Sequence, residues 1–164
     1  MDNQSKKEKF LQKMLQKHAV LQSAEDASKN LKDLNDLLED LINVLPAGCF
    51  CQPSQATINN LSLALLALSG WANSAPIPVA LRLKLKAAIL KVLDEIHSSP
   101  FSCCESIQAL QELELVLLEA IDQPFVRILI KDHLQNLVQQ FQGIIARYVI
   151  CLACEPGPTC LVQN

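Results

Sequence analysis

The stretch PFSCCESIQALQELELVLLEAI, residues 100–121, carries the clearest helix signals in this chain. Ser102 and Glu105 have the spacing of a capping box, which marks a helix N-terminus. Apolar residues then recur every three or four positions, at Ile107, Leu110, Leu113, Leu117 and Ile121. This pattern predicts one amphipathic helix that begins at the adjacent cysteines Cys103 and Cys104.

The same helical spacing of apolar residues extends along most of the chain. It predicts helices over residues 24–46, from Ser54 to a stop at Gly70, from Pro78 to His97, and from Pro124 to Cys154. An N-terminal helix over residues 4–22 either continues into residues 24–46 or breaks near Ser23. Leu81–Lys86 alternates as a strand would, but its leucines also fit a helix. We therefore expect an all-α, antiparallel up-down bundle of five or six helices.

Prolines punctuate the chain at intervals of 22 to 25 residues, at Pro53, Pro78, Pro100 and Pro124. Each is followed by a leucine-rich helical stretch, which indicates helical repeats of about 24 residues. The alternative is that any bundle with short loops spaces its prolines evenly.

Length and charge predict one main domain with an unusual surface. The 164 residues can bury a full core. We divide them into a charged amphipathic arm over 1–23, a bundle over 24–154 and a tail over 155–164. Residues 1–40 hold 15 of the 31 charged side chains, and residues 44–81 hold none. A body so poor in charge favours self-association and other protein partners.

Several function classes lack the motifs that they need. There is no phosphate-binding glycine loop, no serine nucleophile motif and no second copy of Asp94-Glu-Ile-His97 to form a di-iron site, so we do not expect an enzyme. Glu112 and Glu114 point to different sides of a helix, which suits solvation better than acid–base pairing. The lysines of the arm lack interleaved aromatic residues, so nucleic acid is not expected. No signal peptide or transmembrane segment is predicted, so we expect synthesis in the cytoplasm.

Seven cysteines fall into three groups: Cys49 and Cys51, then Cys103 and Cys104, and finally Cys151, Cys154 and Cys160. Alternating helix directions would deliver all three groups to the same end of the bundle, provided that the last helix does not turn at Gly143. The pair that begins a helix should have lowered thiol pKa values and be the most reactive.

Four interpretations of this cysteine cluster stay open. The first is disulfide crosslinking, and because seven is odd, at least one cysteine is free or bonds between chains. The second is a thiolate site for zinc or copper, which His97 could join. The third is a redox site at Cys151-Leu-Ala-Cys154, although it lacks a βαβ context. The fourth is that the cysteines are small buried apolar residues. We expect no cofactor under the first interpretation.

The helices led by Pro78, Pro100 and Pro124, together with the closing Glu155-Pro-Gly-Pro-Thr159, resemble the helical preface domain of collagen-like surface proteins of spore-forming bacteria. The resemblance covers about residues 53–159. This chain departs from the family pattern in its many cysteines and in having no Gly-x-y tract. The resemblance implies a structural protein of a spore outer layer, with a role in assembly or anchoring.

Overall fold

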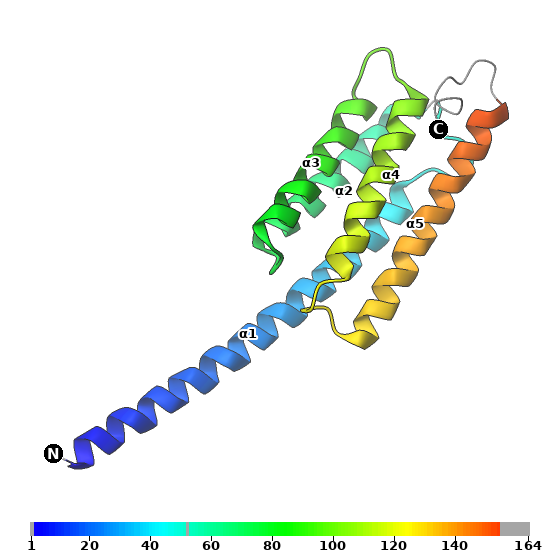
Figure 1. The fold of residues 1–164 in the computed structure, drawn as a ribbon. Helices are drawn as coiled ribbons and strands as arrows, with labels where there is room; N and C mark the ends of the chain where they lie inside the picture. Colours follow the sequence, from blue (N-terminus) through cyan, green and yellow to red (C-terminus); the bar gives the residue numbers. More distant parts are fainter. Residues whose placement is uncertain (1, 52, 155–164) are drawn as a thin grey trace.

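The computed structural model describes residues 2–51 and 53–154, with side chains except those of 2–4, 17–28, 128–129 and 152–154. This part of the chain forms five α-helices and contains no strand: α1 Asp2–Val44, α2 Gln55–Ser74, α3 Val79–Ile96, α4 Cys103–Ile121 and α5 Ile128–Cys154. The prediction of an all-α bundle is confirmed (Figure 1).

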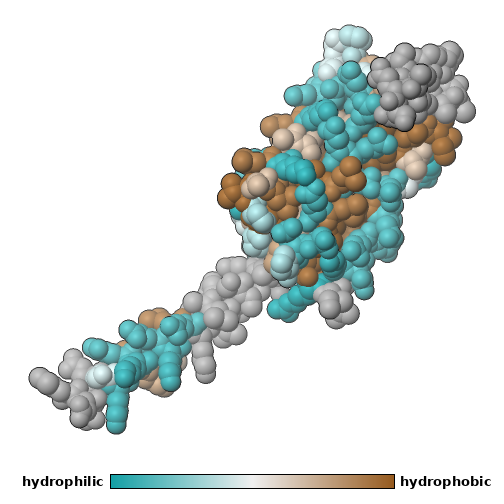
Figure 2. Space-filling view, in the orientation of Figure 1, coloured by the Kyte–Doolittle hydropathy of each residue, from teal (hydrophilic) through white to brown (hydrophobic). Residues whose placement is uncertain are grey.

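The first helix is continuous, so the alternative of a break near Ser23 is wrong. Its 43 residues make α1 about 65 Å long. Its C-terminal part packs in the bundle, whereas its N-terminal part extends past the other helices (Figure 1). Every side chain in residues 5–16 is exposed. These residues lie within the arm predicted over 1–23, and from here on the word arm means residues 5–16 only. Figure 2 shows hydrophilic and apolar side chains together on the part of α1 that projects from the bundle.

The helices form a closed ring in which each packs against its neighbours in the chain, and α1 also packs against α5. The apolar faces expected from the sequence point inward. In α4 the residues that recur at helical spacing are all buried. Among the described side chains of α1, the buried ones are Leu31, Leu34, Leu38 and Leu41, and Leu45 just after the helix is buried as well. The strand-like alternation in α3 arises because Leu83 faces solvent, with 62% of its surface exposed, while Leu81 and Leu85 are buried.

Two predicted helix boundaries are wrong. Gly70 lies inside α2, which continues to Ser74, because a single glycine in a helix costs only about 1 kcal/mol and the flanking Trp71 and Leu68 are buried in the core. The last helix starts at Ile128, four residues after the predicted start at Pro124, and Asp122, which could have capped it, caps the C-terminus of α4 instead. By contrast, the hydroxyl of Ser102 accepts a hydrogen bond from the Glu105 amide at 3.2 Å, as its capping position predicted.

Two glutamates of α4 differ sharply in environment. Glu112 is exposed and pairs with Lys91 at 3.0 Å. Glu114 is only 6% exposed, so the expectation of a solvated side chain is wrong for this residue. Among the residues that the structure describes, no hydrogen-bond or ion-pair partner faces its carboxyl group. Burial therefore raises the pKa of Glu114.

Replacement of Glu114 by glutamine should stabilise the protein at pH 7. The raised pKa means that the folded state binds a proton more tightly than the unfolded chain, so stability falls as the pH rises above the ordinary carboxyl value of 4.5. We expect E114Q to raise Tm by roughly 2–4 °C at pH 7, with the difference shrinking towards pH 4. Thermal unfolding followed by circular dichroism measures this. The control E112Q should give no increase, and an E114Q protein no more stable than wild type at pH 7 would contradict the argument.

Candidate disulfide centre

The connection between α1 and α2, residues 45–54, crosses one end of the bundle. Gly48 has a φ angle of 86°, in the left-handed region that glycine tolerates best. The turn there redirects the chain after α1 ends, so that Cys49, Phe50 and Cys51 follow in sequence across the end of the ring. Phe50 is fully buried, while Cys49 is exposed and Cys51 is half-buried.

Both cysteines of this connection form disulfides with distant helices. Cys49 bonds to Cys151 near the end of α5, with Cα atoms 5.6 Å apart. Cys51 bonds to Cys103 at the start of α4, with Cα atoms 4.8 Å apart. Both Cα separations lie within the usual range for disulfides. The structure therefore joins members of all three sequence groups at one end of the bundle, and α5 runs straight past Gly143 to reach it.

Three further cysteines belong to the predicted cluster. Cys104 also takes part in a disulfide. Cys154 ends α5 but its side chain, like the whole of Cys160, lies outside the described part of the structure. The prediction that Cys103 and Cys104 are the most reactive thiols concerns the reduced protein, since both sulfur atoms are already bonded in this structure.

An aromatic cluster lies beneath the disulfides. No pattern in the sequence predicted it. The Phe50 ring stacks on the ring of Tyr148 in α5, with the ring centroids 5.2 Å apart. It meets the Phe101 ring edge-on, with the centroids 5.8 Å apart. The Tyr148 hydroxyl donates a hydrogen bond of 2.6 Å to the Pro46 carbonyl. Burial raises the pKa of Tyr148, which keeps the hydroxyl protonated as that donor. The connection is thus held by packing and a hydrogen bond as well as by two covalent bonds.

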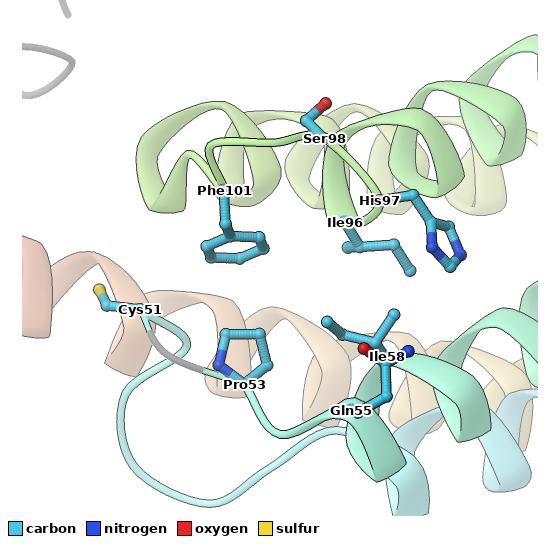
Figure 3. Close-up of a pocket in the computed structure, with 8 residues that line it drawn as sticks. All are labelled: Cys51, Pro53, Gln55, Ile58, Ile96, His97, Ser98 and Phe101. Carbon is cyan, nitrogen blue, oxygen red and sulfur yellow. The ribbon is translucent and has the colours of Figure 1, made fainter.

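A pocket of about 310 Å³ opens beside the Cys51–Cys103 disulfide. Phe101 and Ile96 form one wall, and Pro53 and Ile58 form the opposite wall (Figure 3). His97 contributes an imidazole ring to the lining. Polar and apolar side chains thus contribute about equally to the lining, with Gln55, His97 and Ser98 as the polar ones.

His97 also forms a hydrogen bond with Ser62 of α2. Its Nε2 lies 2.8 Å from the Ser62 hydroxyl, which itself donates to the Ile58 carbonyl at 2.7 Å. The tautomer of His97 decides which group donates in this contact, so the pair does not by itself define a serine nucleophile.

The described residues also offer no preformed metal centre. No group of three histidine, cysteine, aspartate or glutamate side chains lies in a metal-holding arrangement within residues 2–51 and 53–154. Sulfur atoms in disulfides cannot serve as thiolate ligands. A zinc or copper site built from these cysteines would therefore require the reduced protein.

The comparisons with known proteins add no assignment: no protein-family model, curated protein or solved structure matches this chain. None of the helices in the described part is long and apolar enough to cross a membrane.

Proposed function

We propose that this chain is a non-enzymatic structural protein that acts as a disulfide-stabilised unit of a protein assembly. The observation that carries the proposal is the pair of disulfides that ties the α1–α2 connection to both α4 and α5. Such bonds restrict a chain that would otherwise rely on packing alone, which suits a component that must persist outside a reducing cytoplasm.

Covalent crosslinking between copies fits the same chemistry. Seven cysteines can form at most three bonds within one chain, so an odd cysteine is left over in every molecule. A disulfide between the odd cysteines of two chains would couple two units that are already locked internally. The charge-free stretch over residues 44–81 supports further self-association through apolar surface.

The location that best fits these properties is the outer layer of a bacterial spore. Support comes from the resemblance of the proline-led helices to the preface domain of collagen-like spore surface proteins, and from the disulfides, which form and persist in oxidising surroundings. In that setting the chain would assemble or anchor a surface layer.

The disulfide state of protein isolated without reductant tests this function. After thiols are blocked with iodoacetamide, peptide mapping should yield linked peptides joining Cys49 to Cys151 and Cys51 to Cys103. Non-reducing electrophoresis should show a species of twice the chain mass that disappears on reduction. A sample reduced before alkylation, which should carry seven labels, is the control.

Two outcomes would overturn the proposal. A monomer in which all seven cysteines react with iodoacetamide would exclude disulfide stabilisation and crosslinking together. Stoichiometric zinc or copper in anaerobically purified protein, lost in the variant C151S, would favour the thiolate metal site instead.

A further inference from the structure

The arm has an apolar stripe that nothing in the described structure covers. Phe10, Leu11, Met14 and Leu15 are between 53% and 68% exposed. Residues 5–16 also contain four lysines and one glutamate, a net charge of +3. An exposed helix with one basic side and a continuous apolar stripe needs a partner surface that is acidic along one edge and apolar along the other.

The same chain carries such a surface at the groove between α1 and α2. The groove has a volume of about 280 Å³, with Asp33 and Asp36 on its α1 edge and Leu37, Ala67 and Trp71 among its other lining residues. On α2, Leu63 and Leu66 add exposed apolar surface, at 67% and 55% exposure, and α2 contains no charged residue. We call this surface the acidic groove.

The charges on the arm and on the groove match in spacing as well as in sign. Three lysines of the arm stand at positions i, i+3 and i+7, and so do three aspartates on the outer side of α1. When two α1 helices are aligned antiparallel, each lysine falls opposite an aspartate to within one residue, or about 1.5 Å along the axis. The pairs are Lys6 with Asp40, Lys9 with Asp36 and Lys13 with Asp33. Phe10 then falls at the level of Asp36, where the apolar lining of the groove begins.

The arm cannot reach the acidic groove of its own chain. Lys6 and Asp40 lie on one continuous helix, 34 residues or about 50 Å apart. The basic and acidic halves can therefore meet only between two molecules. In an antiparallel pair, the arm of each chain can contact the acidic groove of the other, so two equivalent contacts form. This is the arrangement of a two-fold symmetric dimer.

We infer that two copies of this chain form an antiparallel dimer in which the arm of each lies in the acidic groove of the other. The inference deepens the proposed assembly function by naming the partner and the surface, and it requires no disulfide between chains. The lysines face the aspartates of α1, and the apolar stripe covers Leu63, Leu66 and the groove.

Charge-swap variants of the full chain test this dimer. K6E/K9E/K13E places an acidic arm against an acidic groove, and D33K/D36K/D40K places a basic arm against a basic groove. Each variant alone should dimerise roughly 100-fold more weakly than wild type, since six exposed ion pairs become repulsive. In an equimolar mixture both contacts of the heterodimer are attractive again, so dimers should return to near the wild-type level.

Sedimentation equilibrium of material that is monomeric on a non-reducing gel gives the dissociation constants. Circular dichroism checks that each variant is folded, and K84E/K86E/K91E on α3 is a control of equal charge change that should dimerise like wild type. A monomeric wild type, or a mixture that stays monomeric, would overturn the inference. So would an arm that binds anionic phosphatidylserine vesicles while the protein remains monomeric, which would assign it to a lipid surface. None of these results would alter the disulfide map on which the proposed structural function depends.

Discussion

Removal of the Cys49–Cys151 and Cys51–Cys103 disulfides together should lower the free energy of unfolding by about 8 kcal/mol, which is most of the stability of an ordinary domain. The two bonds are nested: Cys51–Cys103 closes 52 residues and lies inside Cys49–Cys151, which closes 102. Once the inner bond has formed, the outer bond closes an effective loop of only about 50 residues. In the chain-entropy account each bond then contributes about 4 kcal/mol, so loss of either one should cost a similar amount.

Two double variants separate these contributions. Oxidised C51S/C103S and oxidised C49S/C151S should each lose about 4 kcal/mol in guanidinium unfolding, with Tm lowered by roughly 8–16 °C. The control is the same measurement in reductant, where each double variant should match the reduced wild type because the bond is then absent from both. An oxidised double variant that is as stable as the oxidised wild type would show that the bond constrains nothing.

The end of the bundle that holds these bonds could be located from the sequence, since helix direction follows from periodicity and loop length. Cys103 begins α4 where the capping residues Ser102 and Glu105 predict. The pairing could not be deduced, because it depends on how the α1–α2 connection crosses the ring. That path is set by the left-handed turn at Gly48 and by the burial of Phe50, two features without periodicity.

The wrong boundaries have a common physical cause, which is that packing overrides local preference. Gly70 is a plausible helix end by propensity, but Trp71 is buried and its ring nitrogen donates to the Asn30 carbonyl at 2.9 Å, which ties α2 to α1 beyond the glycine. Asp122 could cap either of two helices. It ends α4 and instead forms an ion pair of 2.6 Å with Lys131 of α5, which lowers the pKa of Asp122. Sequence patterns identify the helices well, whereas their ends depend on contacts with distant residues.

Truncation of Phe50 should be the most damaging single change at the disulfide end of the bundle that leaves every disulfide in place. The side chain is fully buried and its ring contacts those of both Tyr148 and Phe101. Its loss removes the transfer free energy of the ring, two aromatic contacts and the packing beneath both disulfides. We expect F50A to lower the free energy of unfolding by about 3–5 kcal/mol.

The disulfides should increase the loss of unfolding free energy in F50A. They hold the connection in place, so the surrounding chain cannot collapse fully into the space that the ring leaves, and the cost should lie towards the upper end of the range. In reduced protein the connection is free to relax, and F50A should cost less. Guanidinium unfolding of F50A and wild type in both redox states measures the difference. The control is L83A, because Leu83 is 62% exposed and its truncation should change stability by less than about 0.5 kcal/mol. An F50A cost that is equally small in both redox states would mean that the disulfides, and not the aromatic cluster, fix the path of the connection.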